Sequence, residues 1–166
     1  MRWDSLADEN CSIARSLAVV GDRWTLLILR DAFLRVRRFD DFEKSLKIAR
    51  RVLSERLALL VDEGILAKNP YQVRPTRYEY KLTEKGLELY PVVMSLVHWG
   101  DKFYAGKNGP PLLHRHLRCG HDFRSVLICS ECGKEINPRE VTVHTGPGAI
   151  PASRNRSRKA ATRSRS

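Results

Sequence analysis

Four residues in the C-terminal third of the chain have types and spacing that could hold a metal ion. Two residues separate His116 from Cys119, two separate Cys129 from Cys132, and nine lie between the pairs. A C-x-x-C followed by glycine is typical of a zinc knuckle, and two knuckles would supply three sulfurs and one nitrogen in tetrahedral geometry. We therefore predict a structural zinc site with these four ligands. The metal would supply folding energy to a region with little core of its own.

Alternatives to this zinc site stay open at the level of sequence. His114 and His121 are rival candidates for the nitrogen ligand. The C-x-x-C could instead be redox-active or vestigial without metal, although no βαβ pattern of a thioredoxin surrounds it. A site with four protein ligands is closed to substrate, and the sequence contains no P-loop, G-x-S-x-G, dinucleotide or deaminase motif. We therefore predict that the protein is not an enzyme.

A second group of residues could bind phosphate and base edges. In the segment 48–66, leucines at i, i+4 and i+7 form one helical stripe that must be buried, and Arg50 and Arg51 lie in the first turn. Arginine at a helix N-terminus opposes the macrodipole at a cost of roughly 0.3–1 kcal/mol per charge. A nearby phosphate would reverse the sign of that cost. The pattern favours a recognition helix in a DNA major groove over an exposed basic helix without a ligand.

Three shorter helical segments precede this helix and would position it. Apolar periodicity predicts helices over 11–20, over 22–35 with Asp22 as cap, and over 39–47 with Asp40 and Glu43 as a capping box. Two helices joined by a tight turn, the second with a basic front, form a helix-turn-helix.

A predicted hairpin follows the recognition helix. Gly64 ends that helix, and 65–69 and 78–82 alternate as strands around a basic loop that contains Arg74 and Arg77. A helix-turn-helix followed by such a wing is a winged helix. The predicted fold is therefore mainly α with a small β-hairpin wing, plus a small zinc-ribbon-like appendage at the C-terminal end.

The last predicted helix runs from about 83 to 104 and has a wide apolar face. Thr83 can cap it, and Pro91 should kink it. A face of this width needs a partner, and a second copy of the chain would cover it. A two-fold homodimer would match a two-fold DNA operator. Packing within one chain is the alternative.

Three segments together resemble the HxlR family of bacterial transcriptional regulators. They are "CSIARSLAVVGDRWTLLILRDAF", "RRFDDFEKSLKIARRVLSERLALLVDEGIL" and "PTRYEYKLTEKGLELYPVVMSLVHWGD", within residues 11–104. The resemblance implies a homodimeric winged-helix protein that binds double-stranded DNA and represses or activates nearby genes. It places the DNA-contacting residues in the recognition helix at Arg50, Arg51, Ser54 and Arg56 and in the wing at Arg74 and Arg77. Ala49 departs from the family, which often has a capping Ser or Thr there.

Cys11 matches the N-terminal cysteine that is a redox switch in some members of the family. A thiol at the start of a helix can have a lowered pKa, and Arg15 one turn later would act in the same direction. Oxidation or alkylation of Cys11 could change the conformation of the dimer and its affinity for DNA. The alternative is a buried, unreactive cysteine.

Composition is consistent with a nucleic-acid partner. The net charge is +11, of which the Arg/Ser-rich stretch 153–166 supplies +6, so the remaining chain keeps +5. We predict a winged-helix and dimerisation domain at 1–106, a zinc-ribbon-like region at 107–145 and a disordered basic tail at 146–166. With neither an apolar span nor a signal peptide, and with few cysteines, the sequence predicts a cytoplasmic protein without membrane contact.

Two classes of function fit these observations. The first is a sequence-specific regulator, taken as a repressor, that binds a palindromic operator as a homodimer and responds to an effector or to oxidants through Cys11. The second is a non-specific, nucleic-acid-associated architectural protein that uses the basic tail and the zinc ribbon.

Overall fold

The computed structural model describes residues 3–149 and divides into two compact units. The larger unit comprises residues 19–126, and the smaller comprises the described parts of 1–18 and 127–166. The predicted Arg/Ser stretch 153–166 lies outside the described residues. Among the described helices, none is both long and apolar enough to cross a membrane.

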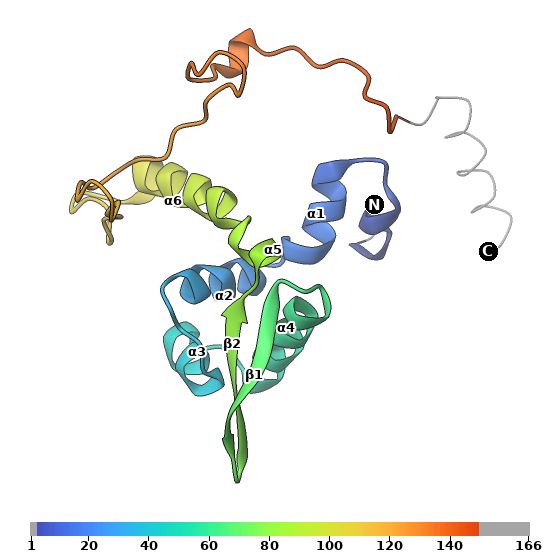
Figure 1. Cartoon of the computed structure of the whole chain (residues 1–166), viewed down its shortest axis with the longest axis vertical. Coiled ribbons are helices and arrows are strands. Elements are labelled where there is room, and N and C mark those ends of the chain that lie inside the picture. The colour runs from blue at the N-terminus through green and yellow to red at the C-terminus, as the bar shows by residue number, and fades with distance from the viewer. Residues whose placement is uncertain (1–2, 150–166) are drawn as a thin grey trace, which may run out of the picture. The chain divides into compact units, whose positions relative to one another are not determined.

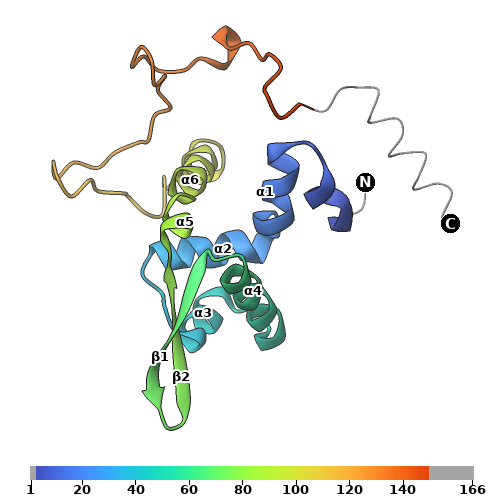
Figure 2. The same cartoon turned by 45° about the vertical axis from the view of Figure 1, so that its right-hand side comes forward.

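The larger unit holds helices and one hairpin in the order of a winged helix (Figures 1 and 2). Its elements are α2 (Arg23–Phe33), α3 (Phe39–Leu46), α4 (Arg50–Asp62), β1 (Leu66–Val73), β2 (Thr76–Leu82), α5 (Glu84–Leu87) and α6 (Tyr90–Tyr104). Helix α1 (Ser12–Val20) crosses the boundary between the units. Two short 3₁₀ helices, Trp3–Asp8 and Pro138–Glu140, belong to the smaller unit. The prediction of a mainly α fold with a hairpin wing is confirmed.

Local capping fixes where several helices begin and end. Asp22 Oδ1 accepts hydrogen bonds from the backbone N–H groups of Trp24 (2.9 Å) and Thr25 (3.3 Å), as predicted for the start of α2. Thr83 caps α5 by accepting from the N–H of Gly86 at 3.1 Å. Gly64 ends α4 with φ +65°, a left-handed conformation that costs glycine little.

The predicted capping box at Asp40 is wrong. Helix α3 is capped at Arg38 without a side-chain hydrogen bond, so Asp40 already lies in the first turn. Its carboxylate lies 3.5 Å from Arg50 Nη1, and Glu43 also pairs with that guanidinium. The two acids therefore join α3 to α4, a tertiary contact that prevails over the local capping pattern.

The wing is longer than the sequence pattern predicts. Strands β1 and β2 pair antiparallel from Leu66 opposite Leu82 to Val73 opposite Thr76, so 70–73 and 76–77 are strand rather than loop. Pro70 is accommodated inside β1 because a two-stranded sheet consists only of edge strands, and the register shifts between Pro70 and Gln72. The hairpin extends beyond α3 and α4 in both views (Figures 1 and 2).

The predicted long, kinked helix at 83–104 is two helices. Helix α5 ends at Leu87, and α6 begins at Tyr90 with Pro91 in its first turn. Proline suits this position because the first N–H groups of a helix have no intrahelical acceptor. The proline therefore starts a helix here and does not bend one.

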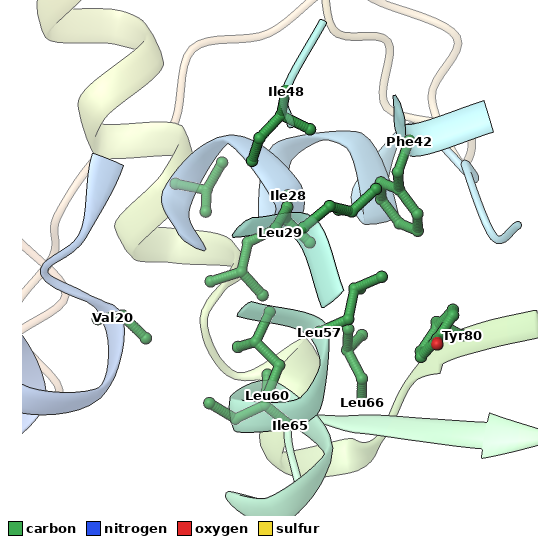
Figure 3. Packing of buried hydrophobic residues seen from close by; sticks show 12 residues of the cluster. Val20, Ile28, Leu29, Phe42, Ile48, Leu57, Leu60, Ile65, Leu66 and Tyr80 are labelled. Atoms are coloured by element: carbon green, nitrogen blue, oxygen red, sulfur yellow. The ribbon is translucent and has the colours of Figure 1, made fainter. Parts of the chain in front are cut away.

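One apolar cluster holds the winged helix together (Figure 3). Ile28 and Leu29 of α2, Phe42 of α3 and Leu53 of α4 are fully buried. The cluster also includes Ile65, Leu66 and Tyr80 at the base of the wing. Truncating one such leucine to alanine typically costs 2–5 kcal/mol, so the orientation of α4 is strongly fixed.

Candidate nucleic-acid interface

Helix α4 has one face committed to the core and one face free for a ligand. Leu53, Leu57 and Leu60 are at most 1% exposed, as the predicted stripe requires. On the opposite side the Arg51 side chain is 90% exposed, and Ser54 is also exposed. A basic helix face held on a rigid core is the arrangement with which a recognition helix enters a major groove.

The start of α4 is fixed by side chains of α3 and not by a cap of its own. Ala49 occupies the cap position and makes no side-chain hydrogen bond. Arg50 takes over part of this task, because it pairs with Glu43 and lies over the Phe39 ring at 4.8 Å from its centroid. In the free protein the guanidinium of Arg50 is therefore directed toward α3.

The other predicted residues of α4 divide into two groups. Arg51 Nε lies 2.9 Å from Glu55 Oε1 on the exposed surface, an ion pair of little energetic weight that DNA could displace. Arg56 is turned inward, with its Nε 3.6 Å from Asp22 Oδ1 at the cap of α2. Arg51 and Ser54 therefore face outward, whereas Arg56 contacts the scaffold.

The wing presents two arginines near its tip. Arg74 lies in the turn between the strands, Arg77 lies in β2, and both are exposed. Within residues 3–149, neither guanidinium has an ion pair, so both are available to phosphate. The hairpin also carries Lys68, which lies 4.2 Å from the Tyr78 ring centroid, and Lys81, which pairs with Glu79.

The structure adds two exposed cations that sequence reasoning missed. The backbone of Arg38 forms an isolated antiparallel β-bridge with Glu79, and its guanidinium lies 4.6 Å from the Tyr71 ring centroid. Both contacts connect the start of α3 to the wing. Lys47 occupies the turn before α4 in a left-handed conformation with φ +50°. Both residues lie at the ends of the helix predicted at 39–47. This position could have identified them, because side chains and backbone N–H groups at helix ends commonly contact DNA phosphates.

Helix α6 carries an apolar stripe that the described chain leaves exposed. Val93 and Met94 point inward and are buried. On another face, Val92, Leu96, Trp99 and Phe103 are 48–59% exposed and follow one another at intervals of four, three and four residues. This is the spacing of a helix seam that packs against another helix.

Cys11 lies immediately before α1 and its side chain is exposed. The alternative that Cys11 is buried is therefore wrong for this structure. Arg15, one turn later, is held by residues that precede α1. The guanidinium bonds the backbone oxygen of Glu9 at 2.9 Å and Asn10 Oδ1 at 3.3 Å.

The predicted zinc ligands occur in two pairs, one in each unit. His116 Nδ1 lies 3.3 Å from Cys119 Sγ. In the other pair, hydrogen bonds from the backbone N–H groups of Cys132 and Glu131 lower the pKa of the Cys129 thiol. Within residues 3–149, no three or more His, Cys, Asp or Glu side chains gather as a metal site.

The sequence matches a known family of helix-turn-helix proteins. A sequence model described as HxlR-like helix-turn-helix matches residues 19–108. The chain is 46% identical over 140 residues to the uncharacterized HTH-type transcriptional regulator Rv3095 of Mycobacterium tuberculosis. The match covers 84% of this chain and 89% of that protein.

Two solved structures resemble the chain in three dimensions. The crystal structure of PA1607, described as a candidate transcription factor, is 30% identical with a TM-score of 0.77, and the match covers 86% of this chain and 99% of that one. The redox regulator HypR in its reduced form is 29% identical with a TM-score of 0.52, over 55% of this chain and 92% of its own.

Proposed function

The chain belongs to the HxlR-like helix-turn-helix family of transcriptional regulators, and from this premise we propose that it is a repressor that binds a palindromic operator as a homodimer. The observation that carries the proposal is the exposed basic face of α4 opposite its fully buried leucine stripe. Repression follows if the bound dimer excludes polymerase from an overlapping promoter.

Arg51 and Ser54 are the proposed base-reading residues. Arginine can donate two hydrogen bonds to the O6 and N7 of guanine, and serine can bond several base edges. Arg74 and Arg77 lie along the phosphate backbone or the minor groove, as wings do. Arg50 exchanges Glu43 for a phosphate, while Arg56 acts indirectly by holding α4 against α2.

Binding of the Arg51→Ala variant to operator and random DNA tests this assignment. Loss of one base contact should cost about 1–3 kcal/mol, or roughly 5- to 150-fold in Kd, on the operator and little on random DNA. Lys107→Ala, an exposed charge beyond α6, is the matched control and should change neither affinity by more than a small factor. Equal losses on both DNAs would reduce Arg51 to a phosphate contact and contradict the proposal.

The proposed dimer buries the exposed stripe of α6. Trp99 and Phe103 stack on each other with centroids 5.7 Å apart, which gives the seam a large aromatic surface. Trp99→Asp should convert a dimer into a monomer in analytical ultracentrifugation, with helical content checked by circular dichroism. Lys107→Glu changes an exposed charge beyond the end of α6 and should leave the dimer intact. A monomeric wild-type protein, or a Trp99→Asp dimer, would refute this interface.

We further propose that Cys11 makes the regulator responsive to oxidants or electrophiles. Its exposure supports this role, as does the likeness to a redox regulator. Hydrogen peroxide would transfer one oxygen to the thiolate as its O–O bond breaks, giving a sulfenic acid and, with a proton from solvent, one water. Peroxide should weaken operator binding by wild type but not by Cys11→Ser. Equal loss in both proteins would assign the effect to another residue.

A further inference from the structure

The larger unit contains a pocket that the proposed DNA interface does not use. The pocket has a volume of about 500 Å³ and lies between α2, α6 and the segment after α6. Every residue that lines it belongs to the larger unit, and none lies in α4, β1 or β2. Sites for small molecules typically enclose roughly 300–1,000 Å³. The pocket therefore has the size of a small-molecule site.

The walls of this pocket are mainly apolar. Helix α6 provides the buried Val93 and Met94, together with Val97. Phe33 of α2 and Tyr90 of α6 also line the pocket, and their tilted rings pack with centroids 5.0 Å apart. Aromatic and aliphatic surface of this kind stabilises the apolar body of a bound molecule, because both surfaces leave water on binding.

One buried carboxylate of the lining has an oxygen without a donor. The Asp31 side chain is 2% exposed, and its Oδ1 accepts from Arg30 Nε at 2.9 Å and from Arg30 Nη2 at 2.7 Å. No group within residues 3–149 donates a hydrogen bond to Oδ2. Buried polar atoms nearly always have a partner, because an unpaired one has lost its solvation without compensation. A single water needs far less room than this pocket has, so the pocket can bring Oδ2 a donor on a larger molecule.

The charged residues of the lining favour a cation as that donor. Asp31 and Asp101 are negative, whereas Arg30 is the single positive residue of the lining and is already bonded to Asp31 Oδ1. A carboxylate or phosphate on the ligand would be repelled by the two acids. A neutral hydroxyl could donate to Oδ2 but would leave the excess negative charge unbalanced. A protonated amine donates a charge-assisted hydrogen bond and balances the charge as well.

We propose that this pocket binds a small organic amine and that the amine is the effector of the regulator. The ammonium group donates to Asp31 Oδ2, and an aromatic or branched apolar body packs against Phe33, Tyr90 and Met94. Binding changes no covalent bond. The class of ligand follows from the unpaired carboxylate oxygen, the excess of negative charge and the apolar walls taken together.

The position of the pocket connects the amine to DNA binding. Leu96 of the exposed α6 stripe lines the pocket, and so does Ser45 of α3, the helix whose acids pair with Arg50 at the start of α4. A bound amine therefore contacts both the helix of the proposed dimer and the helix that positions the recognition helix. Preference of the amine for one arrangement of these helices shifts the affinity for DNA. This regulatory effect rests on the proposed function, whereas binding of the amine does not.

Isothermal titration calorimetry of the full-length, reduced protein tests the pocket without DNA. The probes are 2-(1-naphthyl)ethylamine and two analogues of similar shape, the neutral 2-(1-naphthyl)ethanol and the anionic 3-(1-naphthyl)propionate. We expect saturable binding of about one amine per chain, and roughly ten-fold or more weaker binding of both analogues. Failure of the amine to bind, or binding of either analogue as tightly as the amine, would overturn the proposal.

Two substitutions locate the bound amine. Asp31→Asn should weaken amine binding roughly ten-fold or more, whereas Asp62→Asn, at an exposed position at the end of α4, is the matched control and should not. Gly100 lines the pocket, and a Cβ there meets nothing within 4 Å. Gly100→Leu should therefore occupy pocket space, keep its circular dichroism spectrum and lose amine binding. Unchanged amine affinity in Gly100→Leu would overturn the site, even where Asp31→Asn does not fold.

Operator binding measured by anisotropy, with and without the amine, tests the effector role. Saturating amine should change the operator affinity of wild type by about five-fold or more and leave that of Gly100→Leu unchanged. Amine binding in calorimetry with an unchanged operator affinity would overturn the effector role. Protein that binds no operator even without the amine would instead refute the proposed function, and calorimetry would still decide whether the amine site exists.

Discussion

Gly86 gives a stability prediction whose sign follows from the space around it. A Cβ at this position would lie 2.3 Å from the backbone oxygen of Ile65 and 3.0 Å from Leu82 Cδ2. The closer contact is backbone at the junction of α4 and β1, which cannot rotate away as a side chain can. Overpacking costs about 1–3 kcal/mol, and the helix propensity gained on replacing glycine returns only about 0.5–1 kcal/mol. Gly86→Ala should therefore lower the free energy of unfolding by about 1–2 kcal/mol.

Gly100 in α6 is the matched control for this substitution. A Cβ there meets nothing within 4 Å, and the residue lies inside a helix. Gly100→Ala should therefore raise the free energy of unfolding by roughly 0.5–1 kcal/mol. Urea unfolding followed by circular dichroism, at one fixed protein concentration, measures both changes. A Gly86→Ala protein as stable as wild type, or a shift of both variants in the same direction, would refute the reasoning.

Three further predictions concern the scaffold and the charges of the interface. Asp22→Ala removes the cap of α2 and the partner of Arg56, so the free energy of unfolding measured by thermal denaturation should fall by about 0.5–2 kcal/mol. Asp22→Asn keeps a capping oxygen and should lower the free energy of unfolding less. Glu43→Gln removes one of the two carboxylates of α3 that pair with Arg50, so DNA should bind a few-fold more tightly, with a steeper salt dependence by anisotropy. Unchanged binding would show that the Glu43 ion pair does not restrain Arg50. Truncation after residue 152 removes the six positive charges of 153–166. In filter binding it should lower the affinity for operator and for random DNA by the same factor. A loss of affinity confined to the operator would contradict a non-specific role for this segment.

Sequence periodicity predicted the helices of the winged helix because their signals are local. The leucines of α4, the cap at Asp22 and the left-handed Gly64 each depend on neighbours within a few residues. The predictions failed at residues where a tertiary contact, or the position of a strand in the sheet, outweighs the local sequence pattern. Asp40 pairs with Arg50 instead of capping α3, and Pro70 is tolerated in β1 because no third strand needs its N–H.

The candidate interface was predictable in location but not in detail. Residue type and spacing placed Arg51 and Ser54 on the exposed face of α4, and the structure agrees. Arg56 has the same residue type, yet it turns toward Asp22 of another element, which no local pattern encodes. The likeness of the turns at 114–123 and 127–136 also becomes visible only through their backbone hydrogen bonds, because the two sequences share little beyond Cys-Gly.

Binding of the full-length protein to DNA from upstream of its own and neighbouring genes tests the central claim most directly. Fluorescence anisotropy would be recorded at two salt concentrations with scrambled DNA as competitor. A sequence-specific regulator should bind one fragment about 10³-fold or more tightly than scrambled DNA at physiological salt. Arg51→Ala should remove much of that preference. Binding that falls equally on every fragment and collapses with salt would instead indicate the non-specific architectural protein and contradict the regulator.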